Sequence, residues 1–148
     1  MAARRKQAVR GGPALGVRLE QVAQRLAARR EAALRPLGVG RSQVQQLEEV
    51  AAAPGISTAE LARRVGLAAQ SVASSVASLE TRGWLRRVPH PIHRRLVELT
   101  LTPAGRRILW RARRALGRTE AAAVAGLSSA KRKSLAVLLG EWEATLRE

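Results

Sequence analysis

The sequence predicts a mainly α-helical fold with one small β-hairpin. Most of the chain is rich in Ala, Leu and Arg, and its apolar residues recur at spacings of three and four, the period of amphipathic helices. One stretch differs, because RRVPHPIHRRLVELTLT at residues 86–102 holds two β-like runs around a loop with two prolines. With 148 residues, the chain is long enough for one domain with a buried core.

The N-terminal part of the chain predicts a basic arm and two helices. Residues 1–13 contain paired arginines and a Gly-Gly-Pro break but no periodicity, so we expect a flexible basic arm. A long amphipathic helix is expected within residues 14–37 and ends at the segment PLGVG. A second helix follows Arg41 and ends at the Pro-Gly loop AAAPGIS.

Residues 57–83 predict two short helices joined by a turn. Ser57 is placed to cap the first helix, and Glu60, three residues later, gives the pattern of a capping box. Gly66 supplies the end of this helix. The segment AAQSVASSVASLETRGW then repeats Val and Leu on one helical face and ends at Gly83.

Two strands and two further helices follow. Strands are predicted at residues 84–88 and 96–102, because apolar and polar residues alternate along the second run. Thr102 and Pro103 have the character of a helix cap followed by a proline at the first helical position. A last helix is expected to begin near Ser128.

Two helices that are joined by a glycine-containing turn and followed by a hairpin form a winged helix-turn-helix, which we expect over residues 41–102. In this arrangement the second helix enters the major groove of DNA, and the hairpin, or wing, reaches the backbone or the minor groove. The charge agrees with this, since 27 Lys and Arg residues against 11 acidic residues give a formal net charge of +16. Such an excess predicts a polyanionic partner.

The composition also bears on other functions. The chain has no Cys and no Asp, so thiol chemistry is excluded and a catalytic triad or carboxylate pair would need Glu alone; we expect no enzyme and no cofactor. His90 and His93 offer at most two metal ligands, and hydrogen bonding to phosphate is the favoured interpretation. We find no signal peptide and no membrane-spanning run, so we expect a cytoplasmic protein.

The segments ISTAELARRVGLAAQSVASSVASLETRGWLRR and HPIHRRLVELTLTPAG resemble the MarR family of bacterial winged helix-turn-helix transcriptional regulators. The resemblance extends over nearly the whole chain, including the long first helix and the two last helices. The residues that match the family pattern are Glu60, Leu61, Ala62, Leu79, Glu80, Gly83, Arg87, Arg95, Leu101, Thr102 and Gly105.

Two departures from the family pattern concern DNA binding. The wing has His93 where the family places an acid that is paired with the wing arginine, here Arg95. The second helix of the helix-turn-helix, expected to be the recognition helix, carries no Lys or Arg between Arg64 and Arg82. A glutamine can read adenine through two hydrogen bonds, whereas serine hydroxyls discriminate poorly between bases. We therefore expect Gln70 to be the main base-reading residue, with much specificity coming from DNA shape.

The DNA-binding residues are expected in three groups. On the recognition helix they are Ala69, Gln70, Ser71, Ser74, Ser75 and Ser78. On the wing they are Arg86, Arg87, His90, His93, Arg94 and Arg95, and Arg94 or Arg95 is the expected probe of a narrow minor groove. Contacts to the DNA backbone are expected from Ser57, Thr58 and Arg64.

The resemblance further implies a homodimer and an effector site. Dimerisation helices are implied at residues 14–37 and 104–148 of a single domain spanning 14–148, although intrachain packing of the same apolar residues stays open. The interface candidates are Leu15, Leu19, Leu138, Leu139, Trp142 and Leu146. A small anionic or phenolic effector between these helices and the DNA-binding lobe is implied, with Arg25, Arg29, Arg41 and Trp110 as candidate contacts. Regulation by protein abundance alone is the alternative.

Three functional classes remain open from the sequence. The leading one is a dimeric regulator, a repressor by expectation, that binds a near-palindromic operator with its recognition helices about 34–36 Å apart. The second is a less specific architectural or nucleoid-type DNA-binding protein, which would suit the uncharged recognition helix. RNA binding is the weakest of the three, because the aromatic residues that stack on single strands make up 2% of the chain.

Overall fold

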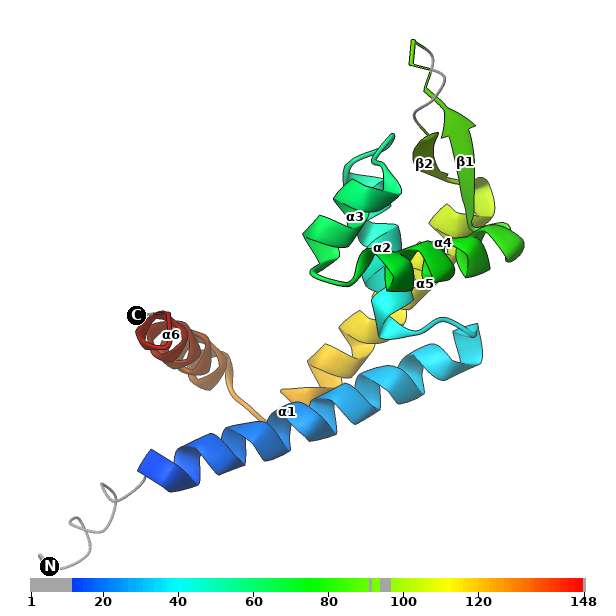
Figure 1. Cartoon of the computed structure of the whole chain (residues 1–148). Helices are drawn as coiled ribbons and strands as arrows, with labels where there is room; N and C mark the ends of the chain where they lie inside the picture. The colour runs from blue at the N-terminus through cyan, green and yellow to red at the C-terminus, as the bar shows by residue number, and fades with distance from the viewer. Residues whose placement is uncertain (1–11, 91, 94–96, 148) are drawn as a thin grey trace, which may run out of the picture.

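The computed structural model describes residues 12–90, 92–93 and 97–147, and the predicted fold class is confirmed (Figure 1). The described residues form helices and one antiparallel hairpin. The elements are α1 (Gly12–Leu34), the 3-10 helix η1 (Arg35–Leu37), α2 (Arg41–Ala52), α3 (Thr58–Val65), α4 (Ala69–Thr81), β1 (Leu85–Pro89), β2 (Val97–Leu101), α5 (Pro103–Ala123) and α6 (Ser129–Thr145).

The first helix differs from the sequence prediction at both ends. It begins at Gly12, inside the segment that was expected to be a flexible arm, because a proline is tolerated in the first turn of a helix. Residues 1–11 of that segment lie outside the described residues. Helix α1 ends at Leu34 rather than Leu37, since Pro36 lies in the 3-10 turn and Gly38 then adopts a left-handed φ of 66°.

Side-chain caps begin three helices where the sequence predicted them. The hydroxyl oxygen of Ser57 accepts from the backbone N–H of Glu60 at 3.2 Å, and Thr102 accepts from Gly105 at 2.9 Å. Ser128 accepts from Lys131 at 3.3 Å in the same way. The reciprocal half of the capping box at α3 is replaced by ion pairs, because the Glu60 carboxylate accepts from two arginines of its own helix.

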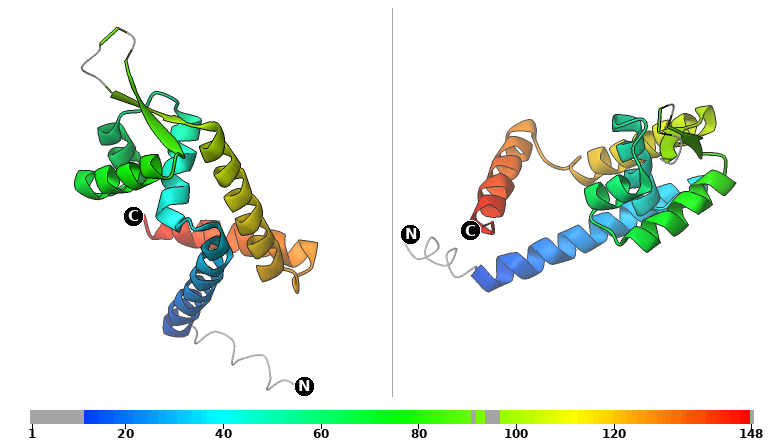
Figure 2. Two further views of the ribbon diagram at one scale, coloured as in Figure 1. Left: turned by 90° about the vertical axis from the view of Figure 1, so that its right-hand side faces the viewer. Right: turned by 45° about the horizontal axis from the view of Figure 1, so that its top comes forward.

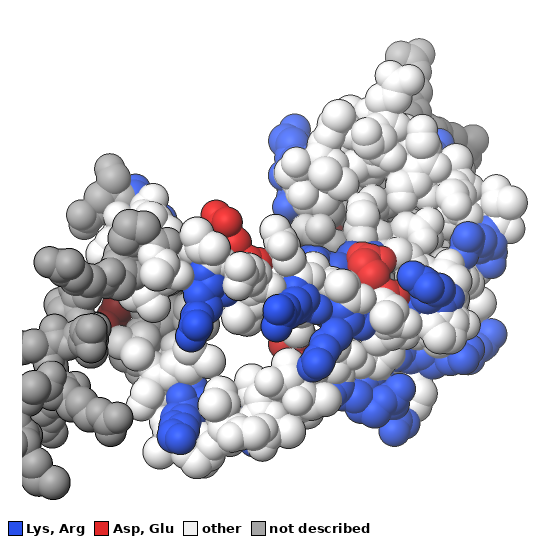
Figure 3. Space-filling view, turned by 90° about the horizontal axis from the view of Figure 1, so that it is seen from below, with Lys and Arg blue, Asp and Glu red and all other residues white. Residues whose placement is uncertain are grey.

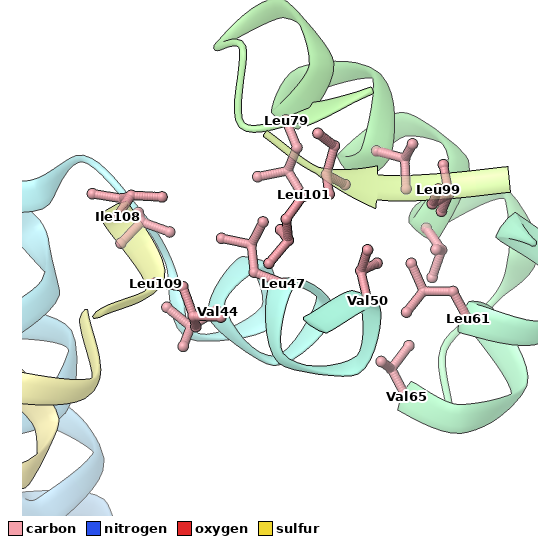
Figure 4. Packing of buried hydrophobic residues seen from close by; sticks show 14 of the residues in the cluster. Val44, Leu47, Val50, Leu61, Val65, Leu79, Leu99, Leu101, Ile108 and Leu109 are labelled. Carbon is pink, nitrogen blue, oxygen red and sulfur yellow. The ribbon is translucent and has the colours of Figure 1, made fainter. Parts of the chain in front are cut away.

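One hydrophobic core lies between α2, α3, α4, the hairpin and the first half of α5 (Figure 4). Leucines from four of these elements are fully buried: Leu47 from α2, Leu61 from α3, Leu79 from α4 and Leu99 from β2. Burial of each such side chain contributes about 1.5–3 kcal/mol relative to exposure. The core therefore fixes the helix-turn-helix against the base of the hairpin.

The hairpin pairs Leu85 with Leu101 and Pro89 with Val97. The loop before α3 is bonded to the same hairpin, because the N–H of Gly55 donates to the carbonyl of Leu99 at 3.1 Å and Leu99 donates back to Ile56 at 2.9 Å. The base of the wing is thus tied to the loop that begins the helix-turn-helix.

The ends of the chain project from this lobe (Figures 1 and 2). Helix α1 packs against α5 through its C-terminal part, and its first half extends away from the lobe. Helix α6 follows a loop after α5, and none of its residues is buried. Among the described helices, none combines the length and the apolar character that crossing a membrane requires.

Candidate nucleic-acid interface

Helices α3 and α4 form the helix-turn-helix. Gly66 ends α3 with a φ of 67°, and its N–H donates to the carbonyl of Arg63. Helix α4 buries Val72, Val76 and Leu79 against the lobe. The opposite face of α4 is consequently directed outward.

This outward face of α4 carries the residues that were predicted to meet DNA bases. Ala69, Gln70, Ser71 and Ser74 are exposed, while Ser75 and Ser78 are half-buried. Gln70 and Ser74 are four residues apart and flank the buried Val72, so both point away from the core. The face offers hydrogen-bonding groups and no charge, and it can fit closely against a groove.

A salt bridge joins the recognition helix to the wing. The Nε of Arg87 on β1 lies 3.0 Å from a carboxylate oxygen of Glu80 on α4. The neighbouring Arg86 donates from Nε to the hydroxyl of Thr100 on β2 at 3.1 Å. These two predicted wing residues thus stabilise the base of the hairpin, and both stay exposed.

The start of the wing loop is organised by His90. Its Nδ1 accepts hydrogen bonds from the backbone N–H groups of Ile92 at 3.1 Å and His93 at 3.0 Å. Its Nε2 lies 3.6 Å from a carboxylate oxygen of Glu98, and its ring centroid lies 5.2 Å from that of His93. The His90 side chain thus has hydrogen-bond partners within the loop, whereas His93 is exposed.

Part of the predicted wing lies outside the described residues, namely Arg94 and Arg95. The expected relation between His93 and Arg95 falls there as well. Within the described ranges no group of three His, Cys, Asp or Glu side chains is placed to hold a metal ion.

The predicted backbone-contact residues lie at the start of α3 and on its side. Ser57 is the helix cap, and Thr58 is half-buried beside it. The Arg64 guanidinium forms salt bridges with two carboxylates. Its Nε lies 3.1 Å from an oxygen of Glu60, and its Nη1 lies 3.7 Å from an oxygen of Glu49. Hydrogen bonds from Arg63 and Arg64 hold the pKa of the Glu60 carboxyl below its ordinary value.

Arg82 is a structural residue that the sequence pattern did not single out. Its guanidinium donates to the carbonyl of Gly38 and lies over the Trp84 ring, 5.0 Å from the ring centroid. The bond joins the end of α4 to the turn before α2. Because the partners are 44 residues apart in the chain, no local signal could have revealed it.

The four residues predicted to line an effector site do not share one cavity. Trp110 lines a cavity of about 560 Å³ at the base of the wing, together with Val50, Leu101 and Leu109 and with Arg86, Arg106 and Arg113. Arg41 lines a separate cavity of about 670 Å³ between α1, α2 and α5. Arg25 and Arg29 are exposed on α1 and line neither of these two cavities.

The predicted interface residues lie on the two projecting helices. Leu15 and Leu19 of α1 are exposed, as are Leu138, Leu139 and Leu146 of α6 or its C-cap. Trp142 is half-buried. Large side chains such as Leu138, which is 61% exposed, have no core to enter within the described chain.

Comparison with known proteins gives one family and one fold. Residues 37–96 match the model of the MarR family. Wild-type MarR of E. coli, without ligand, is 23% identical with a TM-score of 0.74, and the match covers 86% of this chain and 95% of that one. A mutant of S. aureus MepR is 15% identical with a TM-score of 0.82, covering 88% and 97%.

A MarR-family protein of Mycobacterium tuberculosis, solved in complex with DNA, is 28% identical with a TM-score of 0.72 and covers 86% of this chain and 96% of that one. The comparison with curated proteins found no match. The matched segment includes α2, α3, α4 and the described part of the wing up to His93.

Proposed function

We propose, from the match of residues 37–96 to the model of the MarR family, that this chain is a sequence-specific transcriptional regulator of double-stranded DNA. The observation that carries the proposal is the rigid connection of α4 to the wing. The Glu80–Arg87 salt bridge and the buried core hold both elements in one body, and the outward face of α4 carries Gln70 and Ser74. No enzymatic activity is part of this proposal.

In the proposed complex, α4 lies in the major groove and Gln70 is the main base-reading residue. The serines of α4 fit close to bases or phosphates, and the wing arginines enter the minor groove. Because Arg86 is bonded to Thr100 within the hairpin and Arg87 is paired with Glu80 of α4, Arg94 and Arg95 are the proposed groove contacts. The uncharged face of α4 leaves much of the affinity to phosphate contacts and DNA shape.

The proposed active form is a homodimer. The exposed leucines of α1 and α6 lie on the two elements that project from the DNA-binding lobe, and exposed apolar patches of this kind mark protein interfaces. A two-fold dimer would place two α4 helices about one turn of DNA apart, roughly 34–36 Å, on a near-palindromic operator.

A small anionic effector is proposed to bind in the cavity beside Trp110. The cavity is lined by the apolar residues Val50 and Leu109 and by the cationic residues Arg86 and Arg106. Arg86 belongs to the wing, so a ligand there would change the wing geometry and release DNA, as expected of a repressor. Quenching of Trp fluorescence by aromatic carboxylates or phenols, together with loss of the protein–DNA complex, tests this.

Selection from a random double-stranded DNA library at about 0.15 M salt tests the central proposal. We expect a near-palindromic motif that is bound at least roughly 1,000 times more tightly than random DNA. A ratio near one would overturn sequence-specific regulation and favour an architectural DNA-binding protein, which the uncharged α4 face also suits. Preference for RNA over the duplex would contradict both.

A further inference from the structure

Several exposed arginines of α1 and α5 lie on one side of the molecule, away from the recognition helix. On α5 the exposed residues Arg107, Arg111, Arg114 and Arg118 follow each other at spacings of four, three and four. These spacings place them in a row on one face of the helix. The row extends for about 16 Å at a rise of roughly 1.5 Å per residue.

The same face continues onto α1. A cavity of about 380 Å³ lies between the two helices and is lined by Ala33 and Pro36 on one side and by Arg111, Arg114 and Arg118 on the other. Arg25 and Arg29 precede Ala33 by eight and four residues, so they lie on the helical face of α1 that borders this cavity. We call Arg25, Arg29, Arg107, Arg111, Arg114 and Arg118 the α1–α5 basic face.

Acidic side chains are separated from this basic face. Among the described residues, none of its six arginines forms a salt bridge, whereas Arg30 and Arg113 on the other sides of the same helices pair with Glu120 and Glu48. Figure 3 views the molecule from below and shows many Lys and Arg side chains there beside few acidic ones. Like charges at these helical spacings destabilise a helix, so an anionic partner would relieve their repulsion.

The basic face is turned away from the outward face of α4. In Figure 2, α4 and α5 lie on opposite sides of the lobe with α2 between them. A duplex bound to α4 would therefore leave the basic face uncovered. The guanidinium of Arg114 is held over the Trp110 ring at 4.7 Å, which limits the freedom of one member of the row.

We propose that the α1–α5 basic face binds the phosphate backbone of a second DNA duplex, so that one dimer bridges two DNA segments; this rests on the proposed DNA-binding function. A row about 16 Å long is long enough to contact more than one phosphate along a DNA strand. Arginine suits the role because its guanidinium can donate two hydrogen bonds to one phosphate. A single small anion would occupy only part of the row.

A two-duplex capture experiment tests this inference. One operator duplex is immobilised, the full-length protein is added, and retention of a second, fluorescent duplex is measured at several salt concentrations. The test variant is Arg111→Gln/Arg114→Gln/Arg118→Gln. We expect it to retain at least roughly tenfold less second duplex, and to lower the slope of log K against log salt by about 2.7, while its affinity for the single operator changes less than about twofold.

The matched control is Lys131→Gln/Arg132→Gln/Lys133→Gln, which removes the same charge from exposed positions of α6. Equal loss of capture in both variants would make the effect one of net charge and overturn the inference. Conversion of the test variant to a monomer in sedimentation would instead identify the face as a subunit interface. If the wild-type protein binds one duplex but no second duplex, this inference is overturned and the proposed function stands. If it binds no duplex at all, the proposed function is overturned as well.

Discussion

Gln70 is the exposed amide on the outward face of α4, and it stands among serines and alanines. The Gln70 amide can form two hydrogen bonds to one adenine at the same time. A serine hydroxyl can contact any base, so Gln70 discriminates between bases better than its serine neighbours. We expect Gln70→Ala to reduce discrimination at one base pair of each half-site by about 1–3 kcal/mol. Competition binding with operator variants measures this. Ser71→Ala is the control, and an unchanged base preference in Gln70→Ala would contradict the assignment.

His90 provides a second effect at the scale of one residue. Its Nδ1 is the acceptor of two backbone N–H bonds, so removal of the imidazole leaves both N–H groups without this acceptor. We expect His90→Ala to lower the order of the Ile92 and His93 amides, as measured by NMR order parameters.

His90→Asn is the matched control. It keeps a side-chain oxygen that can accept from the backbone two residues later, so the amides of this variant should stay ordered. Equal order of the two amides in the wild type and in His90→Ala would contradict the role given to His90.

At the scale of elements, Gly105 determines how closely α5 approaches the hairpin. A Cβ at this position would lie 1.9 Å from the carbonyl oxygen of Trp84, which is a backbone atom and cannot rotate away. We expect Gly105→Ala to destabilise the protein by about 1–3 kcal/mol in urea unfolding, because β1 and α5 must separate.

Gly117 on the same helix is the matched control. Nothing lies within 4 Å of the position its Cβ would take, so Gly117→Ala should stabilise the helix by about 0.5–1 kcal/mol. Equal effects of the two substitutions would show that close approach at Gly105 is not the cause.

At the scale of the whole molecule, the projecting helices carry the prediction of a dimer. Leu138 is 61% exposed on α6, and that helix buries none of its residues in the described chain. We expect Leu138→Glu to leave the lobe folded and to yield a monomer in analytical ultracentrifugation, with weaker binding to a palindromic operator. Lys131→Glu on the same helix is the control. A Leu138→Glu protein that remains dimeric would place the interface elsewhere.

Local chemistry made much of this fold predictable. Ser57, Thr102 and Ser128 begin helices as predicted, because a cap acts on an N–H only three residues away. The hairpin was predicted to within one residue at each strand end from alternation along the chain. Gln70 and Ser74 on α4 are exposed for the same reason, since helical periodicity alone separates them from Val72 and Val76.

Contacts between distant segments account for what was missed. The bond from Arg82 to Gly38, the pairing of Arg87 with Glu80 and the acceptor role of His90 depend on how the hairpin and the loops pack. The effector candidates illustrate the same limit, because Trp110 and Arg41 line different cavities.

The sequence by itself determined the class of fold, the positions of the helix caps and the polar face of α4, because each depends on interactions within about four residues. Only the tertiary structure decided which arginines are held by acids and which form the α1–α5 basic face. A net charge of +16 gives the sum of the charges, whereas their separation into paired and unpaired groups depends on which helices pack together.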